Sequence, residues 1–348
     1  KHFKLMADID LSRFTGKDFN IIGYYRTWEG RKPFKGVFDG NGKKISNFSY
    51  TSVDANEIGL FGCVSEGAQI KKLGLIDPNV DVGTGSRIGS LVGWLRYGTI
   101  TGCYVEGGSI SGFQFVGGLV GITTFNSTIT NCYATSVVFG VDDIGGLIGA
   151  NNWTLTNCYA TGNVTGHSNL GALVGSNEGT ISNCYSMGNV SGDTLVGGLV
   201  GQNGGTYSGR EGAAFPGDID NCYSRCSVRG KAMVGGLVGY NNVGTITKCY
   251  ATSSVMGTAD VGGLVGAGNK LGFWKSEVTL SLWDIQTSGQ ATSVGGMGKT
   301  TVEMQTASTF LEAGWDFVVE TENGTEDIWW IEEGQGYPRL WWEPVPEN

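Results

Sequence analysis

The residues that could do acid–base chemistry are few and scattered in this sequence. Two histidines are present, His2 and His167, and His167 lies in a Gly-His-Ser turn. The chain has no HExxH or GxSxG motif and no Ser/His/Asp set with assignable roles. We therefore predict that the chain is not an enzyme and that it has no catalytic residue and no cofactor.

Acidic residues offer the remaining route to catalysis or metal binding. Pectin-degrading enzymes built on parallel β-helices use clustered Asp with Arg or Lys on one outer face. The candidates lack basic partners that recur in adjacent repeats: Asp142, Asp143, Asp218 and Asp220. Calcium could be bound by Asp8 and Asp10, or by Asp218 and Asp220. We favour exposed acidic turns for these residues and predict no metal site.

Six of the eight cysteines share one position of an internal repeat: Cys103, Cys132, Cys158, Cys184, Cys222 and Cys249. Their spacing does not match a CxxC metal site. Disulfides between neighbouring repeats need a dihedral angle near 90°, which parallel stacked side chains supply poorly. We favour a structural ladder of buried thiols that behave as small apolar residues.

Cys63 and Cys226 lie outside this ladder. Cys63 follows a hexapeptide at a position where other repeats carry Trp94, Ile122 or Gln202. Because that position varies so widely, we expect Cys63 to be exposed and either reactive or cross-linked. Cys226 has no clear repeat equivalent, and the redox state of both residues is left open.

A tyrosine follows each ladder cysteine: Tyr104, Tyr133, Tyr159, Tyr185, Tyr223 and Tyr250. If these side chains point outward, they form an aromatic stripe along one face, which is our candidate interaction site. The stripe could bind sugar rings or pack against another subunit. The alternative, which we favour, is stacking between neighbouring repeats that only stabilises the fold.

The repeat that positions these residues is built on the hexapeptide Val-Gly-Gly-Leu-Val-Gly. Variants return about every 26 to 30 residues. They start at Ile58, Ile88, Val116, Ile144, Leu170, Val196, Val234 and Val261, with a degenerate ninth at Val294. A period of this size is typical of a solenoid, in which each repeat packs against its neighbours.

Each repeat contains three short β-branched or apolar runs separated by Gly, Asn and Ser, which are turn residues. We predict an all-β fold, a right-handed parallel β-solenoid of eight or nine coils stacked over roughly 40 Å. The Leu residues of the hexapeptides should form one interior column. The glycines should serve positive φ angles or close backbone approach.

One segment of the repeat conflicts with strict strand alternation. If Ile181 faces inward, alternation puts Asn183 inward and Cys184 outward. A bend or bulge at Asn183 would let Ile181 and Cys184 both face the interior and leave Tyr185 outside. We favour the bend, because a column of buried Asn is costly unless its amides form a hydrogen-bonded ladder.

The hexapeptide resembles the GLUG repeat, found in bacterial surface proteins and beside the catalytic domain of immunoglobulin A peptidases. The resemblance covers roughly Ile58 to Gly298, and the segments Phe3–Ser12 and Phe34–Tyr50 look like the leaders that introduce such repeats. It implies a solenoid at the cell surface but little about activity, because family members differ in what they attach to it. The zinc motif of the peptidase relatives is lacking from this sequence.

Both ends and one insertion depart from the repeat. Asp39-Gly40-Asn41-Gly42 predicts a hairpin or tight turn. Thr300 and Glu303 form a capping box that predicts a helix to about Leu311. The longest spacing between hexapeptides predicts a loop over Gly204–Gly217 that leaves the stack. Aromatic residues gather near the C-terminus: Trp315, Phe317, Trp329, Trp330, Tyr337, Trp341 and Trp342.

These aromatic residues favour a small mixed cap with one short helix, which covers the last coil and blocks edge pairing. A docking surface for a second subunit is the alternative. We expect three parts: a leader over residues 1–56, the solenoid over 57–298, and a Trp-rich cap and tail over 299–348. The stretch from Glu343 looks like a linker or a free tail. The first residue is Lys1, so we also expect that an N-terminal segment has been removed.

Composition limits the partners. The formal net charge is −9, and 16% of residues are charged, so no basic footprint for nucleic acid is present. No apolar run approaches the ~20 residues of a membrane helix. We predict a secreted or cell-surface structural or adhesive protein that associates with itself or with surface polysaccharide, with no nucleic-acid partner and no membrane insertion. The alternatives are a carbohydrate-binding module that uses the tyrosine stripe and, third, a polysaccharide-degrading enzyme.

Overall fold

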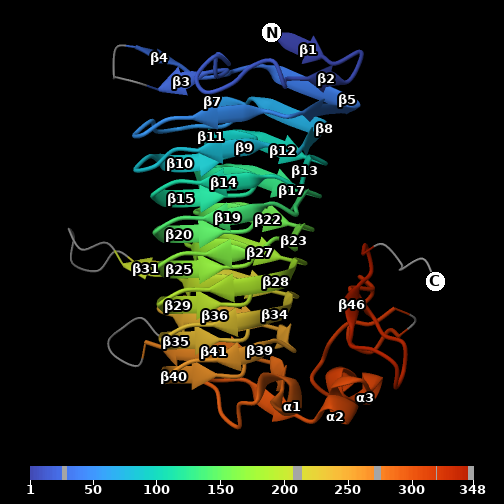
Figure 1. The fold of residues 1–348 in the computed structure, drawn as a ribbon. Helices are drawn as coiled ribbons and strands as arrows, with labels where there is room; N and C mark the ends of the chain where they lie inside the picture. The colour runs from blue at the N-terminus through green and yellow to red at the C-terminus, as the bar shows by residue number, and fades with distance from the viewer. Residues whose placement is uncertain (26–29, 207–213, 270–275, 319, 344–348) are drawn as a thin grey trace.

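Each repeat of the sequence forms one coil of a parallel β-solenoid in the computed structural model (Figure 1). The structure describes the whole chain except residues 26–29, 207–213, 270–275, 319 and 344–348. The first half of the hexapeptide and the residues before it form one flat sheet, and the second half forms another. The remainder of each repeat forms the third side of the coil.

The sheet built from the second half of the hexapeptide has one strand in each of eight coils. Its members are β7 (Phe61–Val64), β11 (Val92–Arg96), β16 (Val120–Thr124), β21 (Ile148–Asn151), β26 (Val174–Asn177), β30 (Val200–Asn203), β36 (Val238–Asn241) and β41 (Val265–Gly268). The sheet that precedes it in each coil comprises β10 (Ser86–Gly89), β15 (Gln114–Gly117), β20 (Asp142–Gly145), β25 (Ser168–Gly171), β29 (Thr194–Gly197), β35 (Ala232–Gly235) and β40 (Ala259–Gly262). The predicted number of coils is confirmed.

The third side consists of shorter strands that also pair in parallel from coil to coil. Its first row is β8 (Gln69–Ile76), β12 (Thr99–Thr101), β17 (Thr128–Thr130), β22 (Thr154–Thr156), β27 (Thr180–Ser182), β33 (Gly217–Asp220), β37 (Gly244–Thr247) and β42 (Glu277–Thr279). The tyrosine row follows as β13 (Tyr104–Glu106), β18 (Tyr133–Ala134), β23 (Tyr159–Ala160), β28 (Tyr185–Ser191), β34 (Tyr223–Arg229), β38 (Tyr250–Ala251) and β43 (Leu282–Asp284). The last row is β9 (Asn79–Asp81), β14 (Ser109–Ser111), β19 (Val137–Phe139), β24 (Val164–Thr165) and β39 (Ser254–Met256).

The apolar residues of successive hexapeptides lie directly over one another. The backbone N–H of Leu119 donates to the carbonyl of Leu147, and Leu147 repeats this bond to Leu173. These leucines are fully buried in one continuous core. The hexapeptide glycines allow close backbone approach, since a Cβ on Gly118 would lie 2.2 Å from the carbonyl oxygen of Gly146. The predicted single interior column is confirmed.

The bend in the third side lies where the sequence predicted it. Asn131, Asn157, Asn183 and Asn221 all have φ angles between 51° and 56°. Asn adopts this left-handed region more readily than most residues. The bend turns the chain so that Ile181 and Cys184 are both fully buried.

The N-terminal leader is the first layer of the stack. β1 (His2–Lys4) and β2 (Ile9–Asp10) pair in parallel with β5 (Val37–Ser46), which pairs in turn with β8. β6 (Ser49–Thr51) pairs with β9, and β3 (Tyr24–Tyr25) with β4 (Arg31–Lys32). The hairpin predicted at Asp39–Gly42 is wrong. The turn is a bulge inside β5, where Asn41 and Gly42 have positive φ and the register shifts.

At the other end, residues after β41 close the stack. The degenerate ninth hexapeptide does not form a full coil. The N–H of Gly263 donates to the carbonyl of Thr292, and the Ser293 hydroxyl accepts from Leu264 and Val265. α1 (Ile285–Ser288) and β44 (Met297–Lys299) continue this closure, and β44 pairs with β43. The edge of the last coil is therefore occupied by the chain itself.

The predicted single helix is two short ones. The capping box of Thr300 and Glu303 is present and opens α2 (Thr301–Met304), and α3 (Ala307–Leu311) follows after Gln305. The residues from 300 to 343, which we call the C-terminal segment, then run back beside the stack to β45 (Trp329–Trp330) and β46 (Arg339–Leu340) (Figure 1). The linker or tail predicted from Glu343 is wrong for Glu343 itself, which is buried and accepts a bond from Tyr223, and its remainder, 344–348, lies outside the described residues.

The insertion predicted over Gly204–Gly217 begins and ends as an antiparallel pair, β31 (Gly205–Thr206) with β32 (Ala214–Phe215). This pair leaves the stack between β30 and β33 (Figure 1). Its intervening residues, 207–213, lie outside the described part of the chain.

Candidate functional site

The six tyrosines predicted as an interaction stripe form one continuous stack. Adjacent ring centroids lie 4.8–5.1 Å apart, and adjacent ring planes differ by at most 10°. This geometry follows from the parallel register, which places Tyr104 over Tyr133 and Tyr133 over Tyr159. We call this row, from Tyr104 to Tyr250, the tyrosine stack.

The ring faces of the stack are covered by one another. Gly74 aligns with Tyr104 at one end, and a Cβ on Gly74 would lie 2.5 Å from Cζ of that ring. Leu282 aligns with Tyr250 at the other end. Ring edges and hydroxyls are what the stack presents outward. An interaction stripe on this face would therefore act through edges and hydroxyls rather than through the ring faces on which sugars stack.

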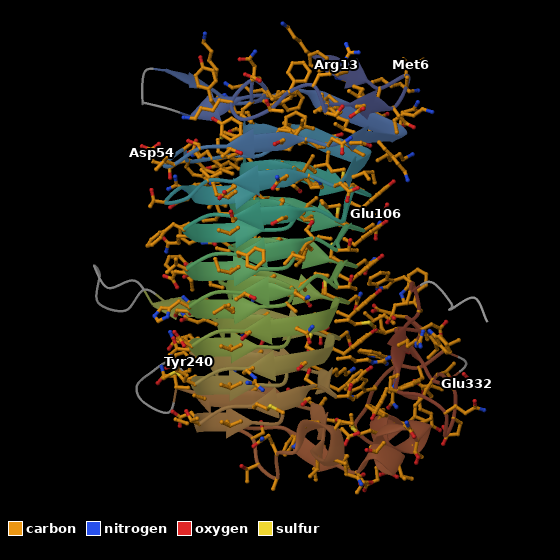
Figure 2. All side chains as sticks on the ribbon, viewed as in Figure 1. Met6, Arg13, Asp54, Glu106, Tyr240 and Glu332 are labelled. Atoms are coloured by element: carbon orange, nitrogen blue, oxygen red, sulfur yellow. The ribbon has the colours of Figure 1, made fainter. Side chains whose placement is uncertain are left out.

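The C-terminal segment covers half of the tyrosine stack. Tyr223 and Tyr250 are fully buried and Tyr185 is 5% exposed, whereas Tyr104, Tyr133 and Tyr159 stay partly exposed. The covering residues form a second apolar cluster that includes Met304, Phe310, Trp315, Trp329 and Leu340. Figure 2 shows Glu106 on the same side of the stack but beyond this segment. The predicted cap therefore covers a side of the solenoid as well as its end.

Polar contacts hold the C-terminal segment in place. The Arg225 guanidinium lies 4.8 Å from the Tyr223 ring centroid and donates to the Tyr250 hydroxyl at 2.7 Å and to the Pro338 carbonyl at 2.9 Å. The Tyr223 hydroxyl donates to Glu343 at 2.8 Å. The Trp329 indole N–H donates to the bend residue Asn221. The segment is thus specifically bonded to the stack.

The aromatic residues near the C-terminus differ in how far their side chains are exposed to solvent. Trp315 and Trp329 are fully buried against the chain itself, and Phe317 is 5% exposed. Trp342 packs on Tyr185 with ring centroids 5.7 Å apart. Trp341, at 56% exposure, is the most open of the tryptophans among the described residues. A subunit-docking surface made from the buried members would require the C-terminal segment to detach.

The cysteine ladder is buried, as the sequence predicted, but it has a further role. The six ladder cysteines are free thiols at 1% exposure or less. The bend takes the backbone N–H of each ladder cysteine out of normal strand pairing. The cysteine sulfur of the next coil accepts this N–H instead, as when Cys158 donates to the Cys184 sulfur at 3.4 Å. Ser281 supplies the acceptor for Cys249. Burial raises the pKa of Cys103 to about 12, so this thiol stays protonated.

The prediction that Cys63 is exposed is wrong. Its side chain is fully buried. The leader lies over β7 here, because the N–H of Cys63 donates to Gly23 and its carbonyl accepts from Phe34. Cys226 is also buried, where its thiol bonds to the Gly198 carbonyl at 3.2 Å. Both thiols are inside the protein, so reactivity with outside reagents is not expected.

The structure also contains a buried asparagine ladder that the sequence analysis did not predict. Its side-chain amides bond from coil to coil. Asn151 donates to Asn177 at 2.9 Å, Asn177 donates to Asn203 at 2.8 Å, and Asn203 donates to Asn241 at 3.0 Å. These residues are at most 1% exposed. The Asn that stands two residues after each of four successive hexapeptides was the available signal, and only tertiary stacking shows that the amides meet.

The acidic candidates do not converge. Asp142 and Asp143 lie in β20, whereas Asp218 and Asp220 lie in β33 on another side of the coil. Asp8 and Asp10 are exposed and accept bonds within the leader. In the described part of the chain, no group of three or more His, Cys, Asp or Glu could hold a metal ion.

Asp143 instead adjoins Glu178, a residue that sequence analysis did not single out. Both line a groove of about 350 Å³ on the outer face. Burial raises the pKa of Asp143 to about 6, and burial with the nearby Asp143 charge raises that of Glu178. Gln114 and Asn169 donate to Asp143, and Asn152 donates to Glu178. These amides hold both carboxyl groups in fixed positions.

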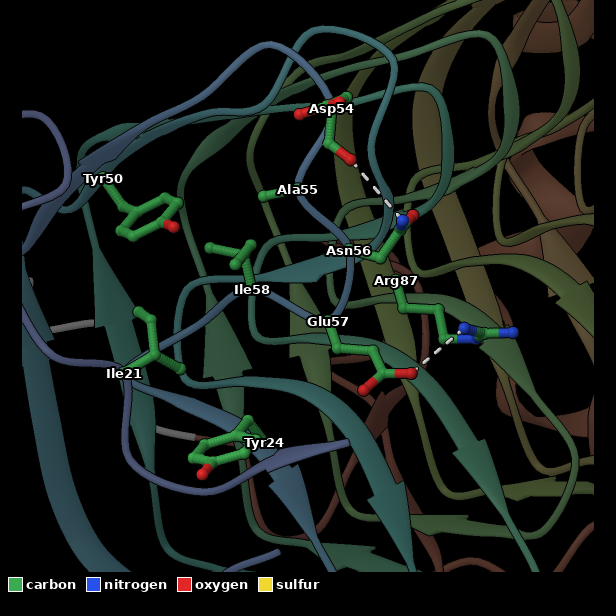
Figure 3. A pocket seen from close by; sticks show the side chains of 9 residues that line it. All are labelled: Ile21, Tyr24, Tyr50, Asp54, Ala55, Asn56, Glu57, Ile58 and Arg87. Carbon is green, nitrogen blue, oxygen red and sulfur yellow. Dashed lines mark hydrogen bonds and ion pairs between the residues drawn. The ribbon is translucent and has the colours of Figure 1, made fainter. Parts of the chain in front are cut away.

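A larger pocket of about 490 Å³ lies where the leader meets the first coils (Figure 3). We call it the leader pocket. Its lining residues are Ile21, Tyr24, Tyr50, Asp54, Ala55, Asn56, Glu57, Ile58 and Arg87. Arg87 donates to Glu57 at 3.2 Å, and Glu57 is only 9% exposed. Burial raises the pKa of Glu57 despite this partner. Sequence analysis did not predict this pocket.

The similarity of this chain to a known repeat family lies in individual coils. The family model of the GLUG motif matches residues 116–138, 143–165 and 230–256, and each match coincides with one coil. The chain contains GLUG repeats. The sequence-based recognition of this motif is confirmed.

Two curated relatives match 43% of the chain each. Halomucin from Haloquadratum walsbyi is 33% identical over 155 residues, and a protein from Evansella cellulosilytica, described as a glycine-rich membrane protein, is 35% identical over 153 residues. The chain spans 2% and 17% of their lengths, respectively. None of the described helices of the GLUG-repeat chain is long and apolar enough to cross a membrane.

Among solved structures, the chain is similar to a Bacteroides ovatus protein proposed to be an immunoglobulin A1 protease. The match has a TM-score of 0.48 and 18% identity, and covers 99% of this chain and 86% of that one.

Proposed function

We propose that this GLUG-repeat chain is a non-catalytic structural or adhesive module of a secreted or cell-surface protein. The observation that carries the proposal is the unbroken stack of eight coils in one parallel register, which gives a rigid body with long regular faces. The relatives support the location, since one is named halomucin and the other is described as a membrane protein. In this proposal the chain acts as one part of a longer protein.

We expect self-association to be lateral. Pairing of strands end to end needs free backbone groups at the last coil, and Thr292 and Ser293 already bond to them. At the other end the leader covers β7 and β8, and its own strands β1 and β2 lie outermost. Side faces remain, among them the exposed edges of Tyr104 and Tyr133.

Electron microscopy of the purified protein over a concentration series tests the structural role. Lateral sheets or bundles, in which the rods lie side by side, would support it. Monomers at every concentration would restrict the chain to an adhesive role, and end-to-end filaments would contradict the capped edges. Tyr133→Ser is the informative variant, with Phe139→Ser as the control on another row of the third side, because Phe139 is also exposed.

The polysaccharide-degrading alternative now depends on Asp143 and Glu178. Their carboxyl groups line the same groove, are held in place by amides and have raised pKa values. Reducing-end release from neutral and uronic-acid polymers tests it directly. Turnover that disappears in both Asp143→Asn and Glu178→Gln would overturn the non-catalytic assignment.

A further inference from the structure

The leader pocket is a built cavity rather than a surface irregularity. Its volume of about 490 Å³ falls within the ~300–1,000 Å³ range typical of small-ligand sites. A second hollow of about 520 Å³ shares Ile21, Tyr24 and Tyr50 with it and extends to Lys17 and Asn20. The two tyrosines therefore stand between two connected hollows, which suits an elongated ligand.

The polar groups of the pocket are directed side chains. Glu57 is nine-tenths buried and is oriented by Arg87 through one carboxylate oxygen. Figure 3 shows this carboxylate between Tyr24 and Arg87. Asn56 is fixed because its side-chain oxygen accepts from the N–H of Ser86. A buried carboxylate beside a guanidinium offers acceptors and donors at adjacent positions, as neighbouring hydroxyls of a sugar require.

The backbone N–H groups of Glu57 and Ile58 beside the pocket are already hydrogen-bonded within the protein, so they are not open to a peptide strand. The N–H of Glu57 donates to Ser86 and that of Ile58 donates to Arg87. β7 is bridged by Ile22 and Phe34 of the leader on its open side. Addition of a strand needs a free sheet edge, so recognition here falls to side chains.

Charge argues against an anionic ligand. The pocket contains the carboxylates of Asp54 and Glu57, its cation Arg87 is already paired with Glu57, and the adjoining hollow adds one further cation, Lys17. The chain as a whole carries a net charge of −9. Tyr24 and Tyr50 with Ile21 and Ile58 supply apolar and aromatic surface for the carbon face of a ring.

We propose that the leader pocket binds a neutral oligosaccharide, with Tyr24 and Tyr50 contacting the sugar ring and Glu57 and Arg87 bonding to its hydroxyls. The inference deepens the adhesive role proposed above and rests on it. It places binding at the junction of the leader and the first coil, away from the tyrosine stack.

Isothermal titration calorimetry of the whole chain tests this proposal with four probes: cellopentaose, laminaripentaose, mannopentaose and trigalacturonate. We expect at least one neutral probe to bind and the uronate to bind at least tenfold more weakly. Glu57→Gln and Tyr24→Ala should each lower the affinity tenfold or more. Tyr97→Ala, which removes another exposed tyrosine outside the pocket, should leave the affinity unchanged.

Absence of binding by every neutral probe, or equal affinity in wild type and Glu57→Gln, would overturn the proposal. Tighter binding of the uronate would also overturn it. Asp54→Asn is a second variant at an exposed position, should Tyr24→Ala fail to fold. Electron microscopy of Glu57→Gln separates the two proposals, because assembly should be unchanged when sugar binding is lost.

Discussion

The buried asparagine ladder gives the sharpest prediction about stability. Asn177→Ala removes the acceptor for Asn151 and the donor to Asn203. It also removes two bonds to the backbone of the partly exposed Gly179, whose carbonyl keeps its bond from Asp218. The Asn151 amide keeps its bond to the Trp153 carbonyl, whereas the Asn203 side-chain oxygen loses its donor. A lost hydrogen bond costs about 1 kcal/mol and a buried unpaired group about 1–3 kcal/mol. We therefore expect Asn177→Ala to lower the free energy of unfolding by about 2–4 kcal/mol.

A matched control exists on the surface. Asn189 makes the same amide bond between coils, to Asn163 at 3.0 Å, but both residues are exposed. Asn189→Ala keeps the backbone N–H that also donates to Asn163, so its effect should stay within about 0.5 kcal/mol. Urea unfolding followed by far-ultraviolet circular dichroism measures both. Because stacked repeats can unfold in parts, hydrogen exchange across residues 174–203 provides a local readout. Equal shifts in the two variants would refute the argument that burial makes this ladder stabilising.

Three further predictions concern the C-terminal segment, the thiols and pH. Trp329→Ala should destabilise the protein by about 3–5 kcal/mol, whereas Trp341→Ala, at a 56% exposed position, should change the thermal midpoint little; similar shifts would contradict the described packing. Ladder cysteines and Cys63 should react with a thiol reagent only after unfolding, because all are buried, and labelling of the native protein would count against this. Since burial raises the pKa of Asp143 to about 6, its ionisation should reduce stability as pH rises from about 4 to 6. The thermal midpoint of Asp143→Asn should therefore rise relative to that of the wild type over that pH range. A constant difference between the two midpoints would contradict the prediction.

The features that could be predicted from sequence are those that repeat locally. The hexapeptide period determines the coils, and alternation of apolar residues determines which side chains fill the core. The bend at Asn183 was predictable because strict alternation would bury Asn183 and expose Cys184, and the capping box of Thr300 and Glu303 is a local signal. Each of these depends on residues within one coil or one turn.

The features that escaped prediction depend on which segments meet. Cys63 is buried because the leader bonds across β7, and no pattern around Cys63 shows this. Aromatic composition indicated a cap, but the side it covers is determined by contacts of Arg225 and Trp329 with residues far away in sequence. The leader pocket likewise combines residues from Ile21 to Arg87, which only packing brings together.

Hydroxyl-radical footprinting with mass spectrometry measures whether the tyrosine row is one stack half covered by the chain's own C-terminal segment. Tyr104 and Tyr133 should be oxidised, whereas Tyr185, Tyr223 and Tyr250 should be protected in the native protein. The Trp329→Ala variant should lose that protection. Uniform oxidation of all six tyrosines in the wild-type protein would contradict the account.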